Sequence, residues 1–218
     1  MKQVLFLIYL ASILSSVLTA FIYRKHLESR KLLILLPFLF LVFIQEVLLG
    51  FFILFSEKSQ NAIIYNIYQP VTIIIFAFIY YKVPFMAPVR KLIIAVTIIY
   101  LLVLLVNYSF FQSIKTTDSY LRLVRGFIVT FWALLFLSRY FHLDNLSDEK
   151  YWRPLLWVTI GIAIFYPVIS ISLSFQKYLT DDASTFYGFK LYHLIPRVMS
   201  IFMYSCFSYA FYLCHKKN

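Results

Sequence analysis

Apolar residues fill the chain in seven stretches of about twenty residues each, separated by short polar segments. An apolar α-helix of ~20 residues matches the ~30 Å hydrocarbon core of a bilayer. The pattern predicts transmembrane helices at about residues 3–23, 32–55, 62–82, 92–111, 121–141, 155–176 and 191–213. The expected fold class is therefore all-α and polytopic, a single seven-helix transmembrane domain over residues 1–218 with no soluble domain.

Composition supports the same class, because 62% of the residues are hydrophobic and only 13% are charged, against ~25% charged in soluble domains. The first stretch has no small-residue cleavage motif behind it, so we expect a retained helix rather than a signal peptide. Cys206 and Cys214 lie more than a helical turn apart in the last stretch and are not expected to form a disulfide.

Basic residues concentrate in alternate connections, which predicts the orientation of the chain. One side carries Arg24, Lys25, Arg30, Lys31, Lys82, Arg90, Lys91, Arg139, Lys150, Arg153, Lys216 and Lys217, and the other carries only Lys2, Lys58, Lys115, Lys177 and Lys190. The positive-inside rule then places the amino terminus outside and the carboxyl terminus in the cytoplasm. Since this topology accounts for the net charge of +11, no nucleic-acid partner is expected.

A few ionisable residues fall within the apolar stretches, where charge is costly and marks candidate functional sites. Arg122 lies near the start of its stretch, and we expect its side chain to reach the outer interface. Arg125 and Arg197 lie deeper. Glu46 is the one acidic residue at such depth and requires a partner.

With this orientation, the buried polar residues collect in the outer half of the membrane. The predicted ligand-binding residues are Glu46, Asn66, Gln69, Asn107, Arg125, His193 and Arg197. The inner half is mostly aliphatic and aromatic, so the sequence predicts a polar pocket open to the outside and closed below by apolar side chains. The excess of cations favours a ligand with a carboxylate or phosphate group. The alternative is that these residues only form interhelical hydrogen bonds.

Several chemistries lack the residues they need. The last stretch has no deep lysine for a retinal Schiff base, and the histidines are too scattered for a metal motif. No spacing or Gly-rich motif supports a serine nucleophile with a base. We therefore expect no enzyme activity, no metal and no cofactor.

Two connections and two prolines suggest further roles. The cytoplasmic segment Leu143–Pro154 is a candidate docking surface, although its aromatic residues also suit the membrane interface, and the outer segment 177–190 is a candidate cover for the pocket. Pro70 and Pro196 follow similar polar and aromatic clusters. They raise the alternative of a transporter with broken helices and a 3+1+3 helix arrangement.

Three segments carry a resemblance to a known group: QEVLLG, IYNIYQPVTIIIFAFIYYK and YWRPLLWVTIGIAIFY. They resemble recurrent segments of small, uncharacterised seven-helix membrane proteins of bacterial genomes. The resemblance implies a location in the bacterial inner membrane and transfers no function.

Together these features predict a receptor or sensory membrane component that lies in the lipid bilayer. Its outer pocket would bind a small polar ligand, and a separate cytoplasmic or membrane partner would receive the signal. A small-solute transporter and a structural subunit of a membrane complex are the alternatives.

Overall fold

The computed structural model describes residues 2–55, 61–115, 119–143, 146–175, 185–186 and 189–215. Its elements are α1 (Lys2–Ile22), α2 (Arg24–Ser29), α3 (Leu35–Phe55), α4 (Asn61–Tyr81), the 3₁₀ helix η1 (Pro84–Val89), α5 (Arg90–Val106), the π-helical turn η2 (Asn107–Phe111), α6 (Ser119–Tyr140), α7 (Leu146–Ser174), β1 (Thr185–Phe186), β2 (Phe189–Lys190) and α9 (Leu191–His215). The two short strands pair antiparallel, and the rest of the described chain is almost entirely helical.

Within the described residues, six helices are long and apolar enough to cross a membrane: Gln3–Ile22, Ala62–Tyr81, Pro84–Phe111, Tyr120–Tyr140, Glu149–Ser172 and Leu194–His215. Leu35–Gly50, in α3, is a shorter apolar helix. A spanning helix satisfies its own backbone hydrogen bonds, which lipid cannot do. The helices indicate a multi-pass membrane protein, as the apolar pattern predicts.

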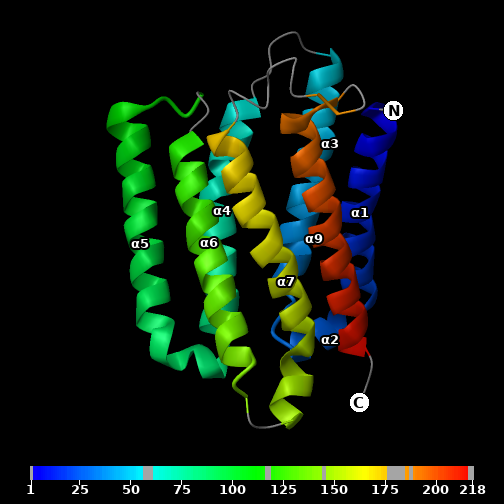
Figure 1. Ribbon diagram of the computed structural model, residues 1–218, viewed down its shortest axis with the longest axis vertical. Coiled ribbons are helices and arrows are strands. Elements are labelled where there is room, and N and C mark those ends of the chain that lie inside the picture. The colour runs from blue at the N-terminus through cyan, green and yellow to red at the C-terminus, as the bar shows by residue number, and fades with distance from the viewer. Residues whose placement is uncertain are drawn as a thin grey trace.

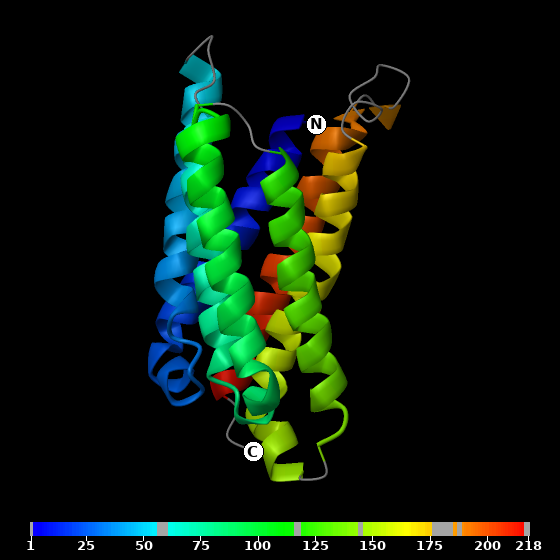
Figure 2. The same cartoon turned by 90° about the vertical axis from the view of Figure 1, so that its left-hand side faces the viewer.

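The long helices lie roughly parallel and alternate in direction (Figures 1 and 2). α1 packs against α3 and α9, α7 packs against α6 and α9, and α4 packs against α5 and α6. α5 lies at the edge of the bundle (Figure 1). We call the end where α1 begins and β1 and β2 lie the strand end. The opposite end, with α2, η1 and the start of α7, is the basic end.

Apolar side chains also cover the outside of the bundle. Leu7, Phe21, Ile99 and Leu105 are each more than half exposed, at 63%, 58%, 60% and 63%. A helix that is apolar on all sides suits a hydrocarbon surrounding rather than water. The outward surface is therefore consistent with contact to lipid.

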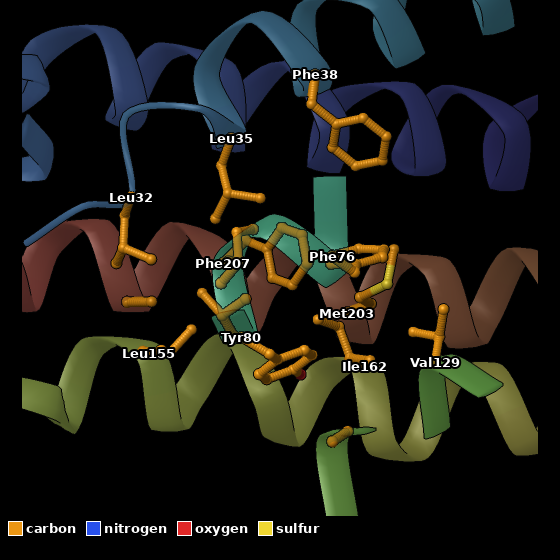
Figure 3. Close-up of a cluster of buried hydrophobic side chains, with 14 of the residues drawn as sticks. Leu32, Leu35, Phe38, Phe76, Tyr80, Val129, Leu155, Ile162, Met203 and Phe207 are labelled. Atoms are coloured by element: carbon orange, nitrogen blue, oxygen red, sulfur yellow. The ribbon is translucent and has the colours of Figure 1, made fainter. Parts of the chain in front are cut away.

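A continuous apolar core fills the centre of the bundle and its basic half (Figure 3). The ring of Phe76 packs edge-on against the rings of Phe38 and Tyr166, with centroids 5.7 Å and 5.8 Å apart. Gly161 lets α7 approach α9 closely, because a Cβ there would lie 3.1 Å from the Cβ of Cys206. Cys206 and Cys214 are both buried and free, which confirms that they form no disulfide.

The start of α7 differs from the sequence prediction. α7 begins at Leu146, so most of the segment predicted as a docking connection is helical. Trp152 is only 6% exposed, and its ring packs edge-on against Phe85 with centroids 5.9 Å apart. This side chain lies inside the protein and not on a docking surface.

Tyr151 is also occupied by contacts within the protein. Arg30 donates a hydrogen bond of 2.6 Å to the Tyr151 carbonyl and lies 4.5 Å above its ring, measured from Cζ to the centroid. The Tyr151 hydroxyl donates a 2.7 Å hydrogen bond to the carbonyl of Ser29. These bonds connect the loop after α2 to the first turns of α7.

Prolines do not interrupt the helices. α4 continues through Pro70, α7 through Pro154 and Pro167, and α9 through Pro196. The broken helices considered for a transporter are therefore not present at Pro70 or Pro196. Most of the predicted cover, residues 177–190, lies outside the described residues, as do the side chains of Tyr192 and His193.

Candidate functional site

The predicted polar residues lie on five elements in the half of the bundle towards the strand end. Glu46 is on α3, Asn66 and Gln69 are on α4, Asn107 begins η2, Arg125 is on α6, and Arg197 is on α9 with His193. Among the residues with described side chains, Asn66 and Gln69 belong to a network of amides, and Glu46, Arg125 and Arg197 belong to a charged cluster. Asn107 lies apart from both.

The amide network joins α4 to α5 and to the chain before α6. Asn66 donates a 2.9 Å hydrogen bond to the carbonyl of Ile114. Gln69 donates to the Asn66 side-chain oxygen at 3.2 Å and to the Tyr108 hydroxyl at 3.3 Å. The Tyr100 hydroxyl completes the network by donating to Gln69 Oε1 at 3.0 Å. Asn66 and Gln69 are almost fully buried, and their side chains are engaged in hydrogen bonds within the protein, as polar residues between membrane helices commonly are.

Asn107 lies apart from the other predicted residues. It donates to Gln112 Oε1 at 3.5 Å. It also lines a mainly apolar groove of about 280 Å³ with Leu102, Val103, Val106 and Phe111. Because this groove lies on α5 and η2 at the edge of the bundle, the structure does not bring Asn107 to Arg125 or Glu46.

Glu46 has its partner on α1. Tyr9 donates a hydrogen bond to the Glu46 carboxylate, and Arg197 lies near enough for its charge to act on that carboxylate. The Arg197 Cζ lies 5.5 Å from the ring centroid of Phe6, and that ring fits against Gly50, where a Cβ would lie 2.8 Å from its Cζ atom. The corner between α1, α3 and α9 thus holds one carboxylate and one cation near each other.

Arg125 is the most unusual residue of the charged cluster. It is only 8% exposed, and its Nε and Nη1 atoms are buried without a hydrogen-bond partner in the described part of the chain. Its Cζ lies 5.8 Å from the ring centroid of Tyr68 on α4, and Tyr166 on α7 also lies within electrostatic range. A buried cation without full hydrogen bonding is costly, so this site is incomplete in the conformation described.

Tyrosines of α4 and α9 connect the two parts of the charged cluster. Tyr68 lies within electrostatic range of both Arg125 and Glu46. Tyr204 on α9 lies within range of Glu46, Tyr68 and Tyr166. We call the charged cluster together with these tyrosines the charged centre, which comprises Glu46, Arg125, Arg197, Tyr9, Tyr68, Tyr166 and Tyr204. With two arginines and one carboxylate, the charged centre formally carries one excess positive charge.

The sequence analysis missed these tyrosines. In the sequence of an apolar helix, a tyrosine whose hydroxyl joins a polar site looks the same as one that only packs, because no spacing of residues distinguishes them. The available signal was the placement of Tyr65 and Tyr68 three residues apart on α4 and of Arg122 and Arg125 three residues apart on α6. Among the residues that the structure describes, no group of three histidine, cysteine, aspartate or glutamate side chains can hold a metal ion.

Comparisons of the chain with protein-family models, with curated proteins and with solved structures found no match. Any functional assignment therefore rests on the fold and on the charged centre.

Proposed function

We propose that the chain is a seven-span membrane receptor or sensory component whose charged centre binds a small anionic ligand. In this proposal α3 also crosses the membrane, which brings the number of spans to seven. The protein lies in a bacterial inner membrane, with the strand end outside and the basic end in the cytoplasm. The concentration of lysine and arginine at the basic end supports this orientation. The first long helix begins and the last long helix ends at opposite ends of the bundle (Figure 1), which agrees with an odd number of spans.

The observation that carries the proposal is the buried guanidinium of Arg125, in which two nitrogen atoms have no hydrogen-bond partner among the described residues. A carboxylate or phosphate would supply both the missing charge and the missing hydrogen-bond acceptors. The Tyr68 ring beside Arg125 is stacked in turn on Phe38, with ring centroids 5.8 Å apart. Apolar rings beside a cation lower the local dielectric constant and so strengthen its attraction to an anion.

Signalling is the better-supported form of activity, because the basic half of the bundle is filled by the apolar core. Ligand binding to Arg125 would favour a helix arrangement in which its nitrogen atoms are paired. A cytoplasmic or membrane partner would detect that arrangement at the basic end. There Arg30 and Tyr151 join α7 to the chain after α2.

A transporter remains the second candidate for one structural reason. Along the chain, three long helices precede α5 and three follow it, and α5 itself lies at the edge of the bundle (Figure 1), as a linker helix would in a 3+1+3 arrangement. A structural subunit fits less well, because we would expect its buried cations to be fully paired within the protein.

The test uses tag-free protein in lipid nanodiscs, titrated with acetate, glutamate or inorganic phosphate while thermal unfolding is followed. A ligand that binds only the folded state stabilises it by ~2.7 kcal/mol at a hundred times its Kd. We expect an anion to raise the unfolding temperature of the unchanged protein and of Arg153→Gln, a charge-matched control at the basic end, but not of Arg125→Gln. No stabilisation by any anion would refute the proposed site.

Proteoliposome flux separates the two candidates. A receptor is expected to bind the stabilising anion without moving it across the membrane. Robust uptake that Arg197→Ala abolishes would instead establish transport.

A further inference from the structure

Two arginines of α6 each lie over a tyrosine of α4, in successive positions. The Cζ atom of Arg122 lies 5.2 Å from the ring centroid of Tyr65, and that of Arg125 lies 5.8 Å from the ring centroid of Tyr68. Both helices begin at the strand end and run in the same direction (Figure 1). The second pair therefore repeats the first about 4.5 Å deeper, at 1.5 Å per residue.

The arginine of the second pair is more buried than the arginine of the first. Arg122 and Tyr65 are partly buried, whereas Arg125 is 8% exposed. The α4–α6 seam thus presents one cation near the strand end and another inside the bundle.

The arrangement over tyrosine rings affects what the arginines can bind. A guanidinium carries its N–H donors in its own plane, whereas a ring beneath it attracts the face of the group. A cation held over a ring can still donate along its edges to an anion. Such edges suit the oxygen atoms of a carboxylate, phosphate or sulfonate.

We propose that Arg122 and Tyr65 form an outer anion subsite, through which an anion approaching from the strand end reaches Arg125. This inference rests on the proposed function and specifies the path to its ligand site. Arg122 attracts the anion from water, and the anion then moves about one helical turn along the α4–α6 seam. Like charges set one behind the other against low-dielectric protein concentrate counter-ions and accelerate their association.

The test measures the rate at which thiol reagents reach a cysteine beside Arg125. Ser170 is 2% exposed, and its Oγ lies against Gly126, the residue after Arg125. The reporter is Ser170→Cys in a background in which Cys206 and Cys214 are replaced by serine. An anionic sulfonatoethyl methanethiosulfonate and an uncharged methanethiosulfonate of similar size are added from the strand end.

We expect Arg122→Gln to slow the anionic reagent about threefold, the effect of one unit charge acting through water at about 7 Å. The uncharged reagent should react at its former rate. The decrease should grow at lower ionic strength, because the charge is less screened. Arg153→Gln removes one positive charge at the basic end and should change neither rate.

An anionic rate that Arg122→Gln leaves unchanged, or lowers no more than Arg153→Gln does, would overturn the outer subsite. If Ser170→Cys does not fold, Ser172→Cys replaces it, since the Ser172 hydroxyl has no hydrogen-bond partner in the described chain. Failure of both reagents to reach a folded reporter would also overturn the path. Anion-dependent stabilisation through Arg125 would in either case leave the proposed function standing, whereas its absence would refute that function.

Discussion

Replacing Arg125 by methionine should make the protein more stable while removing its anion site. Methionine is shorter than arginine, but it is flexible, unbranched and nearly apolar, so Arg125→Met eliminates the buried charge and fills much of the vacated space. The side chain is 8% exposed and has two unpartnered nitrogen atoms, so the substitution isolates the cost of that charge.

The magnitude follows from two opposing contributions. Each buried donor left unsatisfied costs ~1–3 kcal/mol, whereas the contact with the Tyr68 ring returns roughly 0.5–2 kcal/mol. For two unsatisfied nitrogen atoms the balance is about 0–5.5 kcal/mol in favour of methionine, a range that contains the ~1–4 kcal/mol gained when buried ion pairs are replaced by apolar residues. In a chain of this length, 1 kcal/mol corresponds to about 2–4 °C in Tm.

The assay is thermal unfolding of the two proteins in the same nanodiscs without added anion. Arg139→Met is the matched control on the same helix, because Arg139 Nη1 donates a 3.2 Å hydrogen bond to the Phe85 carbonyl. We expect the control to lose stability and Arg125→Met to gain it. A loss at Arg125 equal to that at Arg139 would show that Arg125 is a structural residue and would refute the reasoning.

Three further substitutions test the packing around the site by the same unfolding assay. Gly126→Ala should destabilise by about 1–3 kcal/mol because its Cβ would overlap Ser170 Oγ, and adding Ser170→Ala should restore the loss; an unrestored double variant would refute the close contact. Gln69→Leu should cost roughly 1–3 kcal/mol because it removes the buried hydrogen bonds of Gln69 to Asn66, Tyr100 and Tyr108, and a neutral result would mean that the amide network does not hold α4 to α5. Tyr151→Phe should cost about 0.5–1.5 kcal/mol through loss of the hydrogen bond to Ser29, and no change would indicate that this contact is not formed.

The class of the fold could be predicted from the sequence because hydrophobic length is a local property. Each long apolar stretch specifies its own helix, and six of them meet the length and composition of a spanning helix. The start of α7 was not predicted, since a segment rich in charge ahead of Pro154 resembles a loop. In the structure Trp152 is packed against Phe85, a tertiary contact that the sequence pattern does not contain.

The sequence predicted how deep in the membrane each candidate residue lies, but not which of these residues meet. Charge at membrane depth identified Glu46, Arg125 and Arg197, but depth along a helix does not determine which side of it a residue faces. Asn107 shares the depth of the other residues and yet lines a groove at the edge of the bundle. Tyr9 was missed as the partner of Glu46 because their pairing depends on the packing of α1 against α3.

The most direct test of the anion site is the NMR signal of the Arg125 guanidinium during an anion titration. Protein labelled with ¹⁵N-arginine is placed in nanodiscs, and the Arg125 Nε resonance is assigned by its absence from Arg125→Lys. We predict that acetate or inorganic phosphate shifts this resonance saturably, in the range that stabilises the protein against unfolding. An Arg125 resonance that stays unchanged across that range would contradict the account.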